Sequence, residues 1–330
     1  MGDRWLLPAG LALVGLLFAA ALVGPLLTPH SPDRQLDPVA GRNLPPGTTR
    51  WLVERTDGRT LLAERWETEP GGDLGLWRFD GRQSLPAAEV HRDASGSPVR
   101  PVRFVLGTDR FGRDLAARLL AGARVSLGVG LAALALALTV GIAAGSLAAL
   151  GGRAVDQIVM RGADALLAFP RLFLALAAAA LLGPGIATVV TILGVTGWMG
   201  VARLVRAEIL AAREREWALA ARASGLSPWR IYFRHLLPNS LSPVFVDAAL
   251  RLGDTILVEA SLSFLGLGIQ PPRASWGSLV ADGRDVLGSA WWIAAFPGAA
   301  VAIAVLAFNL VGEGLRDRMD PRRAAGRRTS

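Results

Sequence analysis

Two long stretches without a charged residue constrain the fold of this chain more than any other feature. Residues 5–27 and 125–152 contain no Asp, Glu, Lys or Arg. About 20 apolar residues in a helix are enough to cross the roughly 30 Å hydrocarbon core of a bilayer. A helix also satisfies its backbone hydrogen bonds internally, as lipid surroundings require. The chain is therefore predicted to be an all-α polytopic membrane protein.

Four further apolar runs complete a set of six predicted transmembrane helices. They lie at about residues 163–182, 186–202, 243–267 and 286–311. Residues 1–27 could alternatively be a secretory signal peptide, but the apolar part is long and no clear small-x-small cleavage site follows it. We therefore interpret residues 1–27 as an uncleaved first transmembrane helix and residues 125–315 as a core of five more.

The residue types that are missing exclude several classes of function. Among the 330 residues there is no cysteine, and all 35 basic residues are arginine. Without cysteine the chain forms no disulfide and no Cys-ligated metal site. Without lysine it lacks the P-loop lysine of a Walker-type ATPase. The three histidines, His30, His91 and His235, do not have the spacing of a metal site, so no metal or cofactor is expected in this chain.

Residues 28–104 are polar and rich in Pro and Gly, unlike the rest of the chain. Strand-like segments flank the pair Asp57-Gly58, and a second such pair, Asp80-Gly81, follows another strand-like segment. Asp-Gly pairs are typical of tight β-hairpin turns. The tryptophans in this region argue against a disordered linker, because disordered segments contain few aromatic residues. We predict a small β-rich insert outside the bilayer.

The segment 105–124 precedes the second span and is predicted to be amphipathic. Leu115, Leu119 and Leu120 recur there at helical spacing. Thr108 or Asp109 is predicted to cap this short helix, because their side-chain oxygens can accept hydrogen bonds from its first backbone N–H groups.

The distribution of arginine predicts the orientation in the membrane. Residues 203–234 contain seven arginines and the tail at 316–330 contains six, whereas the turn at 183–185 contains none. Short loops rich in arginine stay in the cytoplasm. Six spans then place both termini in the cytoplasm and residues 28–124 outside. We interpret the basic excess as a topology signal rather than as a nucleic-acid footprint.

Residues 213–238 are expected to form two short helices that meet at a sharp corner. Gly225 suits the left-handed position that ends a helix. Ser227, which precedes a proline, has the residue type of an N-cap. Pro238 is expected to close the second helix, and Pro243 to begin the fifth span. Such a corner could dock in a groove of another protein, or it could be an amphipathic linker on the membrane surface.

Charged residues within the predicted spans are candidates for a substrate pathway or gate. Asp247, Arg251 and Asp254 fall on one face of the fifth span at spacings that allow ion pairs. Because unpaired charges are costly in lipid, this face is expected to point into the bundle or a watery cavity. It could line the pathway or form ion pairs at a subunit interface. Glu259 is a deeper gating candidate, and Arg171 in the third span either snorkels to the cytoplasmic surface or faces the pathway.

The stretch LAARASGLSPWRIYFRHLLPN, residues 219–239, resembles the EAA loop of permease subunits in ATP-binding-cassette importers. Five residues match that pattern in spacing: Ala220, Ala221, Gly225, Leu237 and Pro238. Leu219 stands in place of the motif's Glu, and His235 stands at a usually aliphatic position. The nearby Glu216 could compensate for the missing charge.

Further segments are similar to one branch of that family, the dipeptide/oligopeptide/nickel permeases. They are LGTDRFGRDLAARLLAGARVSL, DALLAFPRLFLALA, EASLSFLGLGIQPPRASWGSLVADGRD and AFNLVGEGLRDRMDP. The resemblance covers about residues 104–321 and is to the subunit usually called the C-type permease. The insert at 28–104 is longer than is usual in that family.

The resemblance implies a type I importer permease fold with six transmembrane helices and no ATP hydrolysis in this chain. It implies that the loop 203–240 couples to one of two cytoplasmic ATPase subunits, which bind ATP. The residues implied in this coupling are Glu216, Leu219, Ala220, Ala221, Gly225, His235 and Pro238. It also implies a second homologous permease subunit, an extracytoplasmic substrate-binding protein and a bacterial inner-membrane location. The implied substrates are peptides or a related small solute such as a nickel chelate.

Two other classes of function are weighed against this one. An ion-coupled secondary transporter would need buried carboxylates in internally repeated, interrupted helices, and the sequence shows no convincing internal repeat. An intramembrane enzyme would need a nucleophile and a base, and no such pair is apparent.

Overall fold

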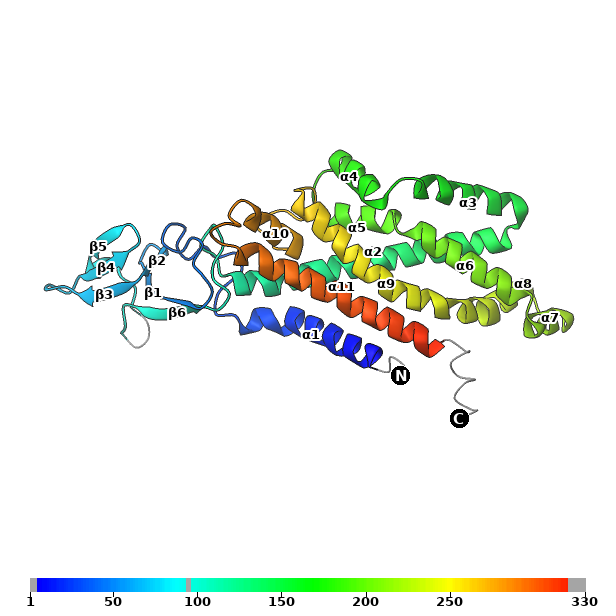
Figure 1. Ribbon diagram of the computed structural model, residues 1–330, viewed down its shortest axis with the longest axis horizontal. Helices are drawn as coiled ribbons and strands as arrows, with labels where there is room; N and C mark the ends of the chain where they lie inside the picture. Colours follow the sequence, from blue (N-terminus) through cyan, green and yellow to red (C-terminus); the bar gives the residue numbers. More distant parts are fainter. Residues whose placement is uncertain (1–4, 93–95, 320–330) are drawn as a thin grey trace. The chain divides into compact units, whose positions relative to one another are not determined.

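The computed structural model describes residues 5–92 and 96–319 (Figure 1). The chain divides into two compact units. The first consists of Met1–Leu17, Ser126–Ile269 and Val301–Ser330, and the second of Phe18–Val125 and Gln270–Ala300. Three long helices contribute residues to both units: α1 (Leu6–Leu27), α2 (Leu115–Leu150) and α11 (Trp292–Met319).

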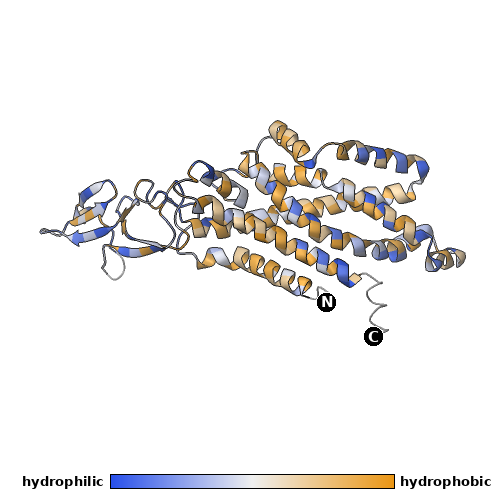
Figure 2. Cartoon of the chain, in the orientation of Figure 1, coloured by the Kyte–Doolittle hydropathy of each residue, from blue (hydrophilic) through white to orange (hydrophobic). Residues whose placement is uncertain are grey.

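The other elements of the first unit are helical. In chain order they are α3 (Gly152–Leu167), α4 (Arg171–Leu182), α5 (Ile186–Val195), α6 (Trp198–Arg213), α7 (Glu216–Ala223), α8 (Pro228–Ile231), the π-helical turn η2 (Tyr232–Leu236) and α9 (Leu237–Phe264). Figure 2 shows that apolar residues dominate α1, α2 and α11, whereas α3 contains many hydrophilic residues.

Small residues allow α2 and α6 to pack closely. A Cβ atom at Gly141 would lie 2.5 Å from Val201 Cβ, and one at Gly145 would lie 2.5 Å from the Ala202 carbonyl oxygen. Both distances are too short for a side chain, so only glycine permits this approach of the two backbones.

Two ion pairs connect α3 to α6. Arg206 Nε donates to Asp156 Oδ1 at 2.5 Å, and Arg203 Nη2 donates to Asp164 Oδ1 at 2.5 Å. Arg203 and Arg206, which the sequence analysis counts as indicators of membrane orientation, therefore also form ion pairs between helices.

Four helical stretches in the described part of the chain are long and apolar enough to cross a membrane. They are Leu6–Leu27, Leu115–Leu150, Ile186–Arg213 and Trp292–Met319. The number becomes five if α3 and α4, which are bent by 87° relative to each other, form one span. The predicted fifth span corresponds to α9, which is long but contains four charged residues.

The helices do not coincide with the predicted spans. The third is not one helix from about 163 to 182, because α3 ends at Leu167 and α4 begins at Arg171, after Pro170. Proline lacks a backbone N–H and disfavours helical geometry in the residue before it, which explains the break. The second span is longer than predicted, since α2 runs unbroken from Leu115, and the sixth begins at Trp292 rather than at Val286.

The predicted caps near α2 and α9 also differ from the structure. Asp114, not Thr108 or Asp109, accepts hydrogen bonds from the first free N–H groups of α2, at 2.9 Å from Ala116 and 3.4 Å from Ala117. Pro238 does not close a helix but lies in the first turn of α9, where a missing N–H breaks no helical bond. The helix α9 then continues through Pro243, which was expected to begin it.

The second unit contains two three-stranded antiparallel sheets and the helix α10 (Trp276–Arg284). One sheet has the order β2-β1-β6 and the other β3-β4-β5. The strands are β1 (Thr48–Glu54), β2 (Thr60–Ala63), β3 (Arg65–Thr68), β4 (Leu74–Arg78), β5 (Gly81–Leu85) and β6 (Arg100–Phe104), with a short 3₁₀ helix at Ala87–Glu89. A single residue, Glu64, separates β2 from β3 and so links the two sheets.

Both Asp-Gly pairs lie at β-hairpins of this unit. The turn between β1 and β2 contains Asp57-Gly58, whereas Phe79 and Asp80 form the turn between β4 and β5, and Gly81 is the first residue of β5. Gly58 has a φ of 82° and Gly81 a φ of 118°, which a residue with a side chain rarely adopts. Buried leucines such as Leu52, Leu62 and Leu76 form the cores beneath the two sheets.

Candidate functional site

Residues 213–238, called the elbow below, contain the two short helices α7 and α8 (Figure 1). Gly225 has a φ of 76° and follows α7 directly after its C-cap, as the sequence predicts. Ser227 is the N-cap of α8, and its side chain accepts a hydrogen bond from the Arg230 backbone at 3.4 Å. The corner therefore forms from local signals: a glycine that accepts left-handed geometry and a serine that caps the next helix.

The inner face of the elbow belongs to the hydrophobic core of the first unit. Ala218 in α7, together with Ile231 and Tyr232, packs in one cluster with Val205 of α6 and Val244 of α9. Fully burying a side chain of the size of Ile231, Val205 or Val244 contributes roughly 1.5–3 kcal/mol. The elbow is therefore packed firmly against the two long helices that it joins.

A buried hydrogen bond adds to this packing. The Tyr232 hydroxyl donates to Ser146 Oγ at 2.6 Å, which connects the elbow to α2. At the end of α6, Arg213 Nη1 donates to the Ala149 carbonyl oxygen at 2.9 Å. Three helices, α2, α6 and α9, therefore hold the base of the elbow.

The outer face of the elbow exposes large apolar side chains. Leu219 is 47% exposed, Trp229 69% and Phe233 60%. The rings of Trp229 and Phe233 stack with centroids 5.7 Å apart. An apolar group of this kind, opposite a firmly packed inner face, is typical of a surface that contacts another molecule.

The predicted coupling residues occupy both faces of the elbow. Glu216 lies in the first turn of α7 and is exposed, as are Ala220 and Gly225. Ala221 is half-buried and packs against the core cluster. His235 is half-buried beside Trp217, with ring centroids 6.4 Å apart, and Pro238 is exposed in the first turn of α9.

The four charged residues of α9 form two groups: Asp247, Arg251 and Asp254 belong to one, and Glu259 lies apart from them. Arg251 Nε forms an ion pair with Asp247 one helical turn earlier. The Arg251 guanidinium lies against α6 at Gly200, where a Cβ atom would be 2.5 Å from Nη2. Asp254, on the next turn, is exposed and has no hydrogen bond or ion pair with any other residue in the described part of the chain.

Arg171 joins the group formed by Asp247, Arg251 and Asp254 from the first residue of α4. Its Nη2 donates to the Leu193 carbonyl oxygen at 3.2 Å and to Thr255 Oγ1 at 3.4 Å. These contacts place the guanidinium between α5 and α9. The structure thus brings together four of the five predicted pathway or gate candidates.

Glu259, the fifth candidate, lies apart from that group and is completely buried. Ser126 Oγ donates to Glu259 Oε2 at 3.0 Å, and Ser263 Oγ donates to Glu259 Oε1 at 2.8 Å. These bonds connect α9 to α2. The geometry favours a bracing role for Glu259 over direct contact with a solute.

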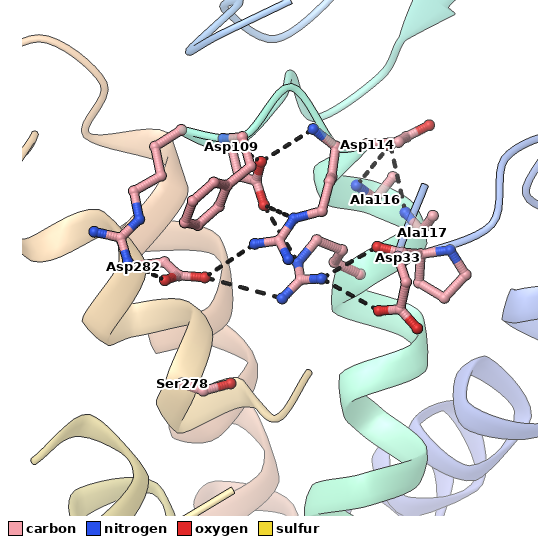
Figure 3. Close-up of polar contacts among 12 residues, drawn as sticks. Asp33, Asp109, Asp114, Ala116, Ala117, Ser278 and Asp282 are labelled. Atoms are coloured by element: carbon pink, nitrogen blue, oxygen red, sulfur yellow. Dashed lines mark hydrogen bonds and ion pairs between the residues drawn. The ribbon is translucent and has the colours of Figure 1, made fainter. Parts of the chain in front are cut away.

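The second unit contains a buried charged cluster that the sequence reasoning did not identify (Figure 3). Asp109 is fully buried and accepts a hydrogen bond from Arg113 Nε at 2.6 Å, and Arg118 Nε lies 3.4 Å from the same carboxylate. Arg110 Nη2 donates to Asp282 of α10 at 3.0 Å, and Arg113 Nη2 lies 3.5 Å from Asp282. The cluster therefore joins the loop before α2 to α10.

Burial raises the pKa of Asp282 above its ordinary value, because a charged carboxylate is less stable away from water. The positive charges of Arg110, Arg118 and Arg113 lower this pKa but do not outweigh burial. One signal in the sequence could have revealed this cluster. Arg118 is a charged residue among the apolar residues that begin a long span, where a charge needs a partner.

No group of three or more His, Asp or Glu residues within residues 5–92 and 96–319 is arranged to hold a metal ion. The described residues form a packed elbow, charged contacts between helices and apolar helices long enough to cross a membrane. Together these features define a membrane protein with several spans.

Comparison with known proteins gives the family. Residues 124–325 match the family described as binding-protein-dependent transport system inner membrane component. Residues 8–46 match the N-terminal TM domain of oligopeptide transport permease C. The chain belongs to this family of inner-membrane transport components, and it is a permease subunit of an ABC importer. Such subunits are not themselves catalytic, and the alternative of an ion-coupled secondary transporter is not favoured.

Relatives match over most of the chain. A putative peptide transport system permease protein of Brucella suis is 41% identical over 275 residues, which are 83% of this chain and 91% of that protein. The dipeptide transport system permease protein DppC of Bacillus subtilis is 33% identical over 315 residues, which are 95% of this chain and 81% of that protein. A solved inward-facing form of the MetNI methionine ABC transporter has a TM-score of 0.50 at 18% identity, covering 61% of this chain and 96% of that chain. This last likeness concerns the fold alone.

Proposed function

We propose that this chain forms half of a peptide pathway through the bacterial inner membrane and is driven by ATPase subunits that dock on the elbow. The relatives in Brucella suis and Bacillus subtilis, which are named as peptide and dipeptide permeases, support a peptide as the substrate. In this proposal a second homologous permease supplies the other half of the pathway. An extracytoplasmic binding protein delivers the peptide.

One observation carries the proposed coupling. A single hydrophobic cluster contains residues of α7 and α8 together with residues of α6 and α9. Because packed side chains resist compression, a displacement of the elbow moves the ends of both long helices. The exposed Trp229 and Leu219 lie on the opposite side, free to contact an ATPase subunit.

The proposed arrangement in the membrane has six spans. The four apolar stretches, the bent pair α3–α4 and the charged helix α9 make up this number. The arginines of residues 203–234 support a cytoplasmic elbow and cytoplasmic termini, and this orientation leaves residues 28–104 on the outer side. The charges of α9 can be tolerated in a span because they lie against α4 and α6 or face a watery pathway.

Replacing Gly225 by valine tests the proposed coupling. A β-branched residue at a φ of 76° is strained by about 1–2 kcal/mol, although no atom lies within 4 Å of the new Cβ position. The strain should change the angle between α7 and α8. We expect the assembled transporter to lose peptide-stimulated ATP hydrolysis.

Gly152→Val is the matched control. Gly152 has a φ of 81° and equally open surroundings, but it begins α3 rather than the elbow. This variant should keep its stimulation. Full stimulation in Gly225→Val, or equal loss in both variants, would refute coupling through the elbow.

A further inference from the structure

We propose that Arg171 binds the terminal carboxylate of a peptide in transit and that Asp254 attracts the terminal ammonium group of the same peptide. This inference rests on the proposed function, because it assumes that peptides pass beside α4 and α9. It adds a binding subsite within the permease, distinct from selection by the binding protein.

Arg171 has no hydrogen bond or ion pair with a carboxylate in the described part of the chain, although the charge of Asp254 lies near enough to attract its guanidinium. Its guanidinium has two neutral partners, the Leu193 carbonyl oxygen and Thr255 Oγ1, and Nε is buried without a hydrogen-bond partner. No ion pair among residues 5–92 and 96–319 includes Arg171. A guanidinium between membrane helices is costly without an anion, so a ligand carboxylate would be stabilised there.

The neighbouring charges determine which ligand fits. Arg251 is already paired with Asp247, so that pair contributes little net charge. Arg171 and Asp254 remain as one cation and one anion that attract each other but form no direct ion pair in the described part of the chain. A simple inorganic anion would satisfy Arg171 but would be repelled by Asp254. A short peptide carries one terminal charge of each sign and complements both residues.

The local backbone leaves room for the guanidinium. A Cβ atom at Gly197 would lie 3.4 Å from Arg171 Nη2, so a larger side chain there would press on the guanidinium. Arginine presents a planar fork of donors that matches a carboxylate, and Thr255 holds part of that fork in place. Nη1 makes no hydrogen bond with any residue in the described part of the chain, so it remains as a donor for the ligand.

The test compares trialanine with its C-terminal amide in the complete reconstituted transporter, including the binding protein. Arg171→Gln removes the charge but keeps hydrogen-bond donors for Leu193 and Thr255. We expect this variant to lower trialanine uptake about tenfold or more, the effect of losing one charge-assisted hydrogen bond. Uptake of the amide should change much less. The binding protein is the same in every assay, so a changed acid-to-amide ratio reports on the permease.

Two further variants complete the comparison. Arg161→Gln makes the same change on α3, at an exposed position, and should leave the acid-to-amide ratio as in the wild type. Asp254→Asn should lower uptake of trialanine more than uptake of N-acetyl-trialanine. Equal loss for free and blocked peptides, or no loss, would show that these residues make structural contacts only and would overturn the inference.

A measurement on the unmodified chain decides the matter if Arg171→Gln does not assemble. Trialanine with a photoreactive diazirine residue at its C-terminus should cross-link to α4 or α9 beside Arg171 and Thr255. Cross-links confined to other helices would overturn the inference. A wild-type transporter that imports no peptide would instead refute the proposed function itself.

Discussion

Replacing Trp229 by alanine should weaken the binding of the ATPase subunit to this permease. Trp229 lies on the outer face of the elbow, is 69% exposed and stacks against Phe233. A tryptophan buries about 150–250 Å² when fully covered, so docking would remove roughly 100–170 Å² of its surface from water. At about 25 cal/mol per Å², this area corresponds to about 2.5–4 kcal/mol.

The loss should be visible as a change in affinity on the order of 100-fold. The assay is titration of the ATPase subunit onto the permease complex held in nanodiscs, with the dissociation constant read from fluorescence. Because the side chain is exposed, the variant should keep the thermal stability of the wild type. Stability and affinity are therefore separable in this experiment.

Trp291→Ala is the matched control for this measurement. Trp291 is 56% exposed and touches Trp292 and Phe296 beside the start of α11, far from the elbow in sequence. It should not change the affinity. An unchanged dissociation constant in Trp229→Ala would show that the exposed ring faces lipid or water and would refute docking at this surface.

Three other substitutions test the packing that supports the elbow and the spans. Ile231→Ala creates a cavity in the buried cluster and should lower the free energy of unfolding by about 2–5 kcal/mol, measured by denaturant unfolding in detergent. Arg118→Met removes one member of the buried cluster around Asp109 and should cost about 3–5 kcal/mol, and a variant as stable as the wild type would contradict the contacts described. Glu259→Ala removes the acceptor for the Ser126 and Ser263 hydroxyls and should lower stability by about 1–3 kcal/mol, whereas loss of uptake at full stability would restore the gating role.

The elbow could be predicted largely from the sequence because its signals are local. Gly225 can follow the end of α7 because glycine readily adopts a positive φ angle. Ser227 caps α8 because its side chain accepts a hydrogen bond from a backbone N–H three residues later. The hairpin turns at Asp57-Gly58 and Asp80-Gly81 are found for the same reason. In each case the residues that decide the conformation are neighbours in the chain.

The features that were missed depend on distant partners or on position within an element. Arg110 and Asp282 are 172 positions apart, so no local pattern joins them. Pro238 and Pro243 were read as helix boundaries, yet one occupies a first turn and the other lies inside α9. Proline indicates a possible boundary, and tertiary packing decides whether the helix ends there.

The candidate pathway residues show an intermediate case. Helical spacing alone places Asp247, Arg251 and Asp254 on one face of a helix. Spacing does not show that Arg251 forms an ion pair with Asp247. It also does not show that Arg171, from α4, lies nearby and donates to a backbone carbonyl oxygen instead of a carboxylate. Partner choice among charges is a property of the packed bundle.

The most direct test of the coupling account uses the absence of cysteine from the sequence. Ala220→Cys places a single thiol on the exposed face of α7, and Val105→Cys places one at an exposed position between β6 and α2. We predict that a short bifunctional maleimide will join the thiol at 220 to an ATPase subunit in intact cells. The thiol at 105 should react instead with a membrane-impermeant maleimide added from outside. Labelling of the thiol at 220 from outside, without a cross-link to the ATPase, would contradict the account.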